Sequence, residues 1–267
     1  MLHTPGEIAK NYIGIGKNKA AMRTDKMFLL AVMAGIYIAV AGCGASAASC
    51  TIGGSAGKLV GACVFPAGLT LVLLAGSELF TGNCLLVIPV LEREISPGAM
   101  LRSWLIVYLG NFVGSVLIAW MAAYSHQLSL FDGQLAAATV NTAVAKVSMP
   151  FVDAFLKGIL CNLLVCLAVW VSFAAKDAAG KVIGLFYPVM VFVVCGFEHS
   201  VANMFYCPAG LFAAGLPEYA EAITADVSNL TWANFLFRNL VPVTLGNIVG
   251  GSLFVGVVYW WAYLHKD

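Results

Sequence analysis

The chain has 267 residues, of which 61% are hydrophobic and only 10% are charged, and its mean hydropathy is +0.91. Soluble domains carry about 25% charged residues, so this composition excludes a soluble single domain and a disordered chain. The formal net charge of +1 gives no reason to expect a nucleic-acid partner. Such a composition is typical of a protein that crosses the lipid bilayer several times.

Six stretches are long and apolar enough to cross a hydrocarbon core of about 30 Å, which needs about 20 helical residues. In chain order these predicted spans cover 27–49, 59–91, 100–123, 151–174, 182–205 and 240–263. We therefore expect an all-α polytopic membrane protein in which residues 27–267 form one domain of six transmembrane helices.

Residues 1–26 are predicted to form an amphipathic helix, and they lack the apolar core of a cleavable signal peptide. Ten lysines and arginines lie in the terminal segments and the loops on their side of the six spans, against at most four on the other side. This bias predicts cytoplasmic N- and C-termini in a cell (inner or plasma) membrane. The first segment either gates the cytoplasmic mouth or simply lies at the membrane interface.

The two halves of the sequence repeat one another. Three pairs around the second and fifth spans are each 120 positions apart: Gly76 and Gly196, Glu78 and Glu198, Asn83 and Asn203. The third and sixth spans share an arginine seven residues before Leu-Gly-Asn-Phe-Val-Gly at 109–114 and Leu-Gly-Asn-Ile-Val-Gly at 245–250. Each unit, about 27–125 and 151–264, has three spans, so the second copy would run in the opposite direction, as an inverted 3+3 repeat.

Glycine and polar residues interrupt the second and fifth spans at 76–83 and 196–203, so both helices are predicted to be broken. Paired interruptions of this kind point to a transport site, because non-helical backbone at membrane depth must line a cavity or be buried in protein. The symmetry of Glu78 and Glu198 favours a structural role, in which each carboxylate accepts hydrogen bonds from backbone N–H groups freed at a break; direct contact with the solute is the alternative. Asn83 and Asn203 share that structural expectation.

Two residues differ between the copies: His199 faces Leu79 in the alignment, and Thr81 faces Val201. Histidine both donates and accepts hydrogen bonds and changes its charge near neutral pH, so His199 would protonate a weak-acid anion or donate a hydrogen bond to it.

Lys146 precedes the fourth span, where its spacing alone suggests an ordinary loop lysine, although it would also attract an anion there. Four apolar residues lie close to the polar groups and would be ordinary core or lipid contacts, or form dewetting constrictions if they flank a pore: Leu69, Phe80, Val165 and Phe192.

Neither a metal site nor a cofactor is predicted. The eight cysteines are scattered and form no Cys-x-x-Cys pair, so we expect buried thiols that behave as small apolar residues. One histidine falls at a span centre, and adjacent Ser200 would not face it on a helix, so no enzyme activity is expected.

Three stretches together closely resemble the formate/nitrite transporter family: Glu-Leu-Phe-Thr-Gly-Asn at 78–83, the run from Cys161-Asn162 to Trp170, and Gly-Phe-Glu-His-Ser-Val-Ala-Asn-Met-Phe at 196–205. The similarity extends from about Thr4 to the end of the chain. It implies an aquaporin-like protomer, assembled as a homopentamer in the lipid bilayer, in which each protomer is a pore for small monovalent anions.

The resemblance also implies roles for individual residues. It assigns pore positions to His199, Thr81, Lys146, Asn162 and Asn247. It assigns constriction positions to Leu69, Phe80, Val165 and Phe192. Formate is the expected substrate, with nitrite or hydrosulfide as alternatives, because the branches of the family share these motifs.

The alternative is a channel for small neutral solutes, since the expected architecture is similar to that of aquaporins. Aquaporins usually carry Asn-Pro-Ala where their half-helices begin, and this sequence contains no such tripeptide. Anion transport is therefore the favoured prediction.

Overall fold

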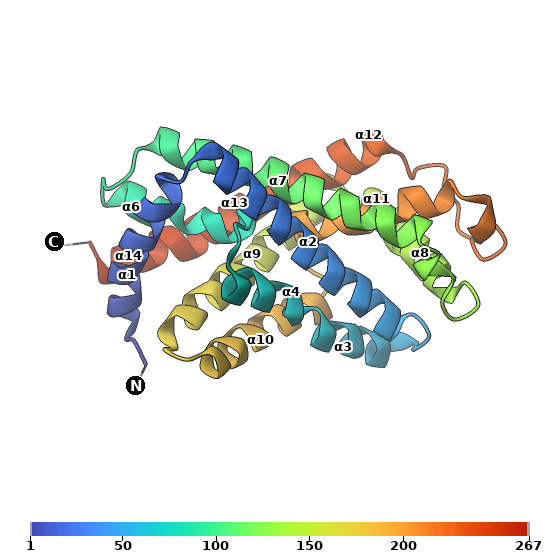
Figure 1. Cartoon of the computed structure of the whole chain (residues 1–267), viewed down its shortest axis with the longest axis horizontal. Coiled ribbons are helices and arrows are strands. Elements are labelled where there is room, and N and C mark those ends of the chain that lie inside the picture. Colours follow the sequence, from blue (N-terminus) through green and yellow to red (C-terminus); the bar gives the residue numbers. More distant parts are fainter. Residues whose placement is uncertain (1, 266–267) are drawn as a thin grey trace.

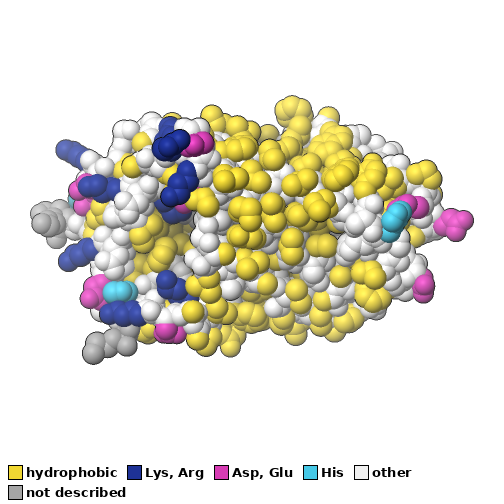
Figure 2. Space-filling view, viewed as in Figure 1, with side chains coloured by type: hydrophobic (Ala, Val, Ile, Leu, Met, Phe, Trp, Pro, Cys, Tyr) yellow, Lys and Arg dark blue, Asp and Glu magenta, His cyan; other side chains and the backbone are white. Residues whose placement is uncertain are grey.

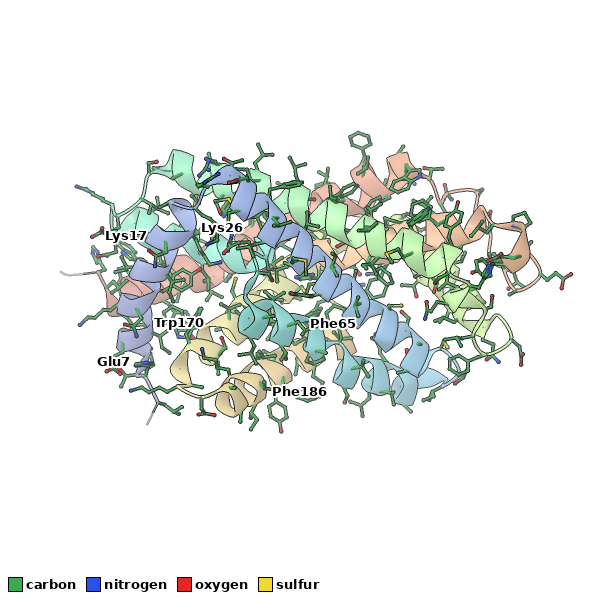
Figure 3. The ribbon with its side chains drawn as sticks, viewed as in Figure 1. Glu7, Lys17, Lys26, Phe65, Trp170 and Phe186 are labelled. Atoms are coloured by element: carbon green, nitrogen blue, oxygen red, sulfur yellow. The ribbon has the colours of Figure 1, made fainter. Side chains whose placement is uncertain are left out.

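A computed structural model describes residues 2–265, and throughout these residues the chain is helical or irregular, without β-strands. The helices form an elongated bundle whose two termini lie at the same end (Figure 1). Glu7, Lys17 and Lys26 lie toward that end, as Figure 3 shows.

The first half starts with α1 (Pro5–Ala20) and the first span, α2 (Thr24–Ser49). The second span is broken. Its first part comprises α3 (Gly54–Val64), α4 (Pro66–Leu71) and the π-helical turn η1 (Val72–Gly76), and its second part comprises α5 (Phe80–Asn83), the 3₁₀ turn η2 (Cys84–Leu86) and α6 (Val87–Leu91). The third span is α7 (Pro97–Tyr124).

The second half follows the 3₁₀ turn η3 (Gln127–Ser129) and starts with α8 (Gln134–Val147) and the fourth span, α9 (Phe151–Ala174). The fifth span is broken into α10 (Ala178–Val194) and α11 (Ser200–Ala214), and the 3₁₀ turn η4 (Pro217–Tyr219) follows it. The sixth comprises α12 (Trp232–Asn234), the π-helical η5 (Phe235–Leu240), α13 (Val241–Ile248), the π-helical η6 (Val249–Val257) and α14 (Val258–Tyr263).

Within the described residues, five helical stretches are long and apolar enough to cross a membrane, and α10 and α11 add a shorter, broken sixth crossing. Two predicted boundaries were wrong. The fifth span extends to Ala214, and the sixth begins at Trp232 instead of Leu240. The wide turn of η5 lets the helix continue past Pro242, whose ring would clash with the preceding turn of a regular α-helix.

The stretch before the fourth span is also more ordered than predicted. Lys146 lies in the last turn of α8 instead of in a loop. Helix α8 stands before the fourth span as α1 stands before the first. Each structural repeat therefore contains an amphipathic helix as well as three spans.

The surface of the bundle matches a membrane environment. Hydrophobic side chains cover a broad band across the visible face, whereas lysines and arginines gather at the end that carries the termini (Figure 2). Leu105 and Ile183 are examples of large apolar side chains that remain mostly exposed. Because hydrocarbon chains or neighbouring subunits can cover such a band, its exposure is compatible with the chain's composition.

Candidate transport pathway

The backbone has the same geometry at the breaks in the second and fifth spans. Before each break the backbone closes a wide turn, in which the N–H of Ser77 donates to the carbonyl of Val72 and that of Phe197 to Phe192, both at 3.0 Å. The chain then passes through a glycine with positive φ, +82° at Gly76 and +68° at Gly196. Glycine adopts this conformation without the steric cost of a Cβ atom, which explains its position at both breaks.

Two asparagines satisfy backbone groups freed at the breaks. The Oδ1 of Asn111 accepts from the N–H of Phe80, and that of Asn247 from the N–H of Ser200, both at 2.9 Å. Their Nδ2 groups donate to the carbonyls of Glu78 and Glu198, both at 2.9 Å. Each asparagine also donates to a backbone carbonyl in the first span of its repeat. Asn111 donates to Ala31 in α2, and Asn247 donates to Gly158 in α9. Asn247, predicted to line the pore, is fully buried and acts as this brace.

The carboxylates have different partners from those predicted. Glu78 accepts from Lys19 at 2.8 Å on both oxygens and from the Nδ2 of Asn83 at 2.8 Å. Glu198 accepts from Lys146 at 2.9 and 3.0 Å and from the Nδ2 of Asn203 at 2.7 Å. The expectation that freed backbone N–H groups bind these carboxylates was wrong, because the asparagine braces already occupy those donors.

Lys19 and Lys146 form a symmetric pair that sequence reasoning missed. Each lies five residues before the first residue of a span, α2 for Lys19 and α9 for Lys146. Both side chains are largely buried, with 20% and 14% of their surface exposed. The equal spacing appears only with the helix bounds of the structure, because the first span predicted from the sequence began at residue 27, eight residues after Lys19.

The two lysines differ in their remaining contacts. Lys19 donates a third hydrogen bond to the Oδ1 of Asn83 at 2.9 Å, so protein acceptors take all three of its N–H groups. Lys146 instead lies over the ring of Tyr206, 5.5 Å from the ring centroid. Among the described residues, the buried Oδ1 of Asn203 has no hydrogen-bond partner. The two ends of the molecule therefore share the same lysine–glutamate pair but differ in the third contact of the lysine.

His199 joins the two breaks. Its Nε2 lies 2.9 Å from the hydroxyl of Thr81, and its Nδ1 accepts from the backbone N–H of Ala202 at 3.0 Å. Because Nδ1 is an acceptor, a neutral imidazole carries its proton on Nε2 and directs it toward Thr81. Both side chains are buried, with His199 only 3% exposed.

Three cavities follow one another past this histidine. The first, of about 270 Å³, lies at the end away from the termini and is lined by Lys58, Lys146, Glu198 and His199 among others. The second, of about 10 Å³, shares Phe65, Phe192 and His199 with the first. The third, of about 40 Å³, shares Leu69 and Leu79 with the second and reaches Lys19. The middle cavity holds at most one water molecule, so the path is closed there.

The middle cavity is a narrow apolar passage. Leu69, Val165 and Phe192 line it, and they are three of the four predicted constriction residues. The ring of Phe192 stacks on His199 with centroids 6.0 Å apart and meets Phe65 edge-on at 5.8 Å. Phe65 and Leu79 are lining residues that sequence reasoning missed; Leu79 could have been found as the repeat counterpart of His199.

The fourth predicted constriction residue, Phe80, lies elsewhere. It lines none of these three cavities. Its ring packs against Tyr108 and Trp104, at centroid distances of 4.9 and 6.2 Å, beside a groove between the third and sixth spans. Phe80 starts a half-helix and aligns with Ser200, and its side chain turns away from the path that Leu79 lines. Thr81 lines none of the three cavities either, and it is connected to the path by its hydrogen bond to His199.

Asn162 lines none of the three cavities either. Its Nδ2 donates to the carbonyl of Thr81 at 3.2 Å and to that of Asn247 at 2.7 Å, and the residue is fully buried. It therefore supports the backbone beneath Thr81. In the described residues there is no group of three or more His, Cys, Asp or Glu side chains placed to hold a metal ion.

Comparisons with known proteins identify relatives along nearly the whole chain. Residues 6–261 match the family described as "Formate/nitrite transporter". A "Probable formate transporter" of Methanothermobacter thermautotrophicus is 39% identical, with 98% of each chain covered. "Formate channel FocA" of Escherichia coli (strain K12) is 38% identical over 98% of this chain and 95% of its own.

Two solved structures are similar to this chain in fold as well as in sequence. A "Pentameric formate channel with formate bound" matches with a TM-score of 0.80 and 37% identity, covering 91% of this chain and 98% of its own. An "FNT family ion channel" matches with a TM-score of 0.82 and 32% identity, covering 97% and 98%.

Proposed function

The chain belongs to the formate/nitrite transporter family, and we propose that it is a multi-pass membrane channel for small monovalent weak-acid anions, with formate as its main substrate. Nitrite and hydrosulfide are the alternative substrates. The observation that carries the proposal is the pair of Thr81 and His199, which lies beside a closed apolar passage between two wider cavities.

The pathway would lower the cost of moving an anion through an apolar passage. A bare anion loses much of its hydration between Phe192 and Leu69, which is costly in a low-dielectric medium. The Nε2–H of His199 and the hydroxyl of Thr81 are the donors that would replace part of this hydration. The backbone N–H of Ala202, at the positive end of α11, fixes the imidazole and polarises its Nε2–H.

This geometry favours hydrogen bonding over proton donation by His199. A neutral imidazole that gives up its only N–H proton becomes an imidazolate, which is strongly unfavourable near neutral pH. A doubly protonated ring carries a proton on Nδ1 and loses its contact with the N–H of Ala202. We therefore propose that His199 acts as a fixed hydrogen-bond donor and that solvent supplies any proton that accompanies the anion.

The orientation follows from the charge distribution. Lysines and arginines gather at the end that carries the termini (Figure 2), so we place this end in the cytoplasm. The cavity of about 270 Å³ then opens outward, and the cavity of about 40 Å³ lies on the cytoplasmic side, where Tyr12 and Lys19 of the N-terminal helix line it. This lining is compatible with a gating role for α1.

The assembly is proposed to be a homopentamer in which each protomer has its own pathway, as the similar solved formate channel is pentameric. No catalytic residue or cofactor is assigned, since the proposed role is passage of an unchanged solute.

Flux into proteoliposomes tests the proposal, with formate, nitrite, hydrosulfide and glycerol as solutes. The experiment is run at about pH 5.5 and about pH 7.5, on either side of the range in which histidine usually changes charge. Selective passage of formate or another weak-acid anion would support the proposal and name the substrate. Passage of glycerol without any anion would overturn it in favour of a neutral-solute channel.

A further inference from the structure

The outer cavity carries one positive charge that no carboxylate balances. Three charged side chains line it: Lys58, Lys146 and Glu198. Lys146 and Glu198 neutralise one another through hydrogen bonds of 2.9 and 3.0 Å. Among the described residues, no carboxylate forms an ion pair with Lys58.

Lys58 also lies close to the break that carries His199. It is an exposed residue in the first turns of α3, and its ammonium group lies against Gly196. A Cβ atom built on Gly196 would be 3.0 Å from the Nζ of Lys58. Gly196 precedes His199 by three residues, so the free charge stands at the entrance to the apolar passage, where the field of a hydrated ammonium group acts on arriving ions.

Among the described residues, the lining of the smaller cavity at the opposite end of the pathway has no unpaired charge to match Lys58. Gly76 and Gly196 are 120 positions apart, and the same spacing aligns Lys58 with Ala178, which is uncharged. The smaller cavity is reached by Lys19, whose charge is balanced by Glu78 at 2.8 Å. Among the described residues, the outer cavity thus has an unpaired lysine, whereas the lysine of the smaller cavity is ion-paired. The two copies also differ in the pair of His199 and Leu79.

We propose that Lys58, and not the ion-paired Lys146, is the residue that captures anions at the outer mouth and sets the rate of entry from that side. The inference rests on the proposed anion-channel function. A unit charge acting over several ångströms of solvent-filled cavity increases the local concentration of a monovalent anion by about threefold at low ionic strength. Because Lys58 is exposed, salt should weaken this effect.

The test is initial formate uptake by right-side-out membrane vesicles, at subsaturating formate, with wild type, Lys58→Gln and Arg238→Gln. Arg238 is the matched control: it is an exposed cation beside Ser148 and Pro150, which follow Lys146 at the outer end, and it lines a different pocket. At about 10 mM ionic strength, where the Debye length is about 30 Å, Lys58→Gln should lower uptake about threefold. The difference should nearly vanish at about 0.5 M, and Arg238→Gln should match wild type at both.

Uptake by Lys58→Gln equal to wild type at low salt would overturn the inference, and so would a loss of equal size at both salt concentrations. Wild-type vesicles that take up no weak-acid anion would instead overturn the proposed function itself, so the two failures are distinguishable.

A second variant separates charge from shape. Lys58→Cys is prepared in a background with Cys63→Ser and Cys195→Ser, because both of these cysteines are exposed, and it is labelled from outside with impermeant thiol reagents of similar size. A cationic label should restore low-salt uptake, and an anionic label should reduce it below that of the unlabelled protein. Equal effects of the two labels would show a steric role and contradict the inference. Background protein that carries Lys58 and receives the same labels controls for other thiols.

Discussion

The hydroxyl of Thr81 and the Nε2 of His199 are 2.9 Å apart, so the break in the second span and the break in the fifth meet at one hydrogen bond. The two residues are 118 positions apart in the chain. They are also positions at which the two repeats carry different residues, whereas the surrounding glycines, glutamates and asparagines are the same in both copies. The proposed solute-binding pair therefore stands inside a symmetric scaffold.

His199→Asn should keep the fold and impair transport. Asparagine is a good N-cap residue, so it preserves the acceptor for the N–H of Ala202, but it lacks the Nε2–H that reaches Thr81. Loss of one hydrogen bond, about 1 kcal/mol, corresponds to roughly a fivefold to tenfold lower formate flux. Flux in proteoliposomes is the measurement. Wild-type flux with unchanged pH dependence would show that the imidazole has no role in passage.

Glu198→Gln should destabilise the protein strongly, because it leaves the buried ammonium of Lys146 without its counter-charge. Breaking one partner of a buried ion pair costs about 3–5 kcal/mol. Glu78→Gln should have a similar effect on Lys19, since that pair is built in the same way. Thermal unfolding in detergent measures both variants.

The control for these variants is an exposed ion pair. Arg23 and Asp25 are 2.8 Å apart but 83% and 67% exposed, so Arg23→Gln should cost about 0–1 kcal/mol. The combined replacement of Lys146 by Met and Glu198 by Gln should recover much of the lost stability. A combined variant as unstable as Glu198→Gln alone would contradict the assignment of the cost to an unpaired charge.

Gly76→Ala should lower stability through the backbone alone. Position 76 has a φ of +82°, and apart from its two chain neighbours no described residue has an atom within 4 Å of where the new Cβ would be placed. The left-handed conformation costs an alanine about 1–2 kcal/mol. Gly14→Ala is the matched control, because outside the neighbouring backbone of helix α1 its Cβ also meets no atom of the described residues within 4 Å. That substitution should stabilise by up to about 1 kcal/mol, and thermal unfolding compares the two.

The first turn of the N-terminal helix should lose stability in acid. The backbone N–H and the hydroxyl of Thr4 donate to the carboxylate of Glu7 and hold its pKa below its ordinary value of 4.5. A depressed carboxyl pKa adds stability above the unfolded value, and this stability is lost as pH falls through the folded value. Hydrogen exchange should therefore show less protection of the first turn of α1 below about pH 4 than near pH 7.

Glu7→Gln is the control for this pH dependence. The variant keeps a side-chain oxygen that accepts from Thr4 but has no proton to gain in that range. Its protection in the first turn should change little between the two pH values. A pH effect as large as that of wild type would assign the change to another group.

The paired spacing in the sequence was enough to predict the broken helices, because the backbone needs the same glycine and polar residues wherever a transmembrane helix is interrupted. His199 and Thr81 were found for the same reason, as departures from the repeat. The partners of the charged residues were not predictable from spacing within the spans. Lys19 reaches Glu78 across 59 positions, from a helix that looked like a separate segment.

Composition and hydropathy by themselves determined that this chain crosses the membrane as helices. The matched spacing of motifs in its two halves determined that it is built from two inverted copies and where both copies are interrupted. Local sequence determines these features, since hydropathy and backbone conformation act over a few turns of helix. Only the tertiary structure decided which polar side chains face the path and which ones stabilise the backbone around it. It turned Phe80 away, buried Asn162 and Asn247 as braces, and paired Lys146 with Glu198 while giving Lys58 no carboxylate partner among the described residues. Each of these outcomes depends on neighbours that the fold brings together from distant helices.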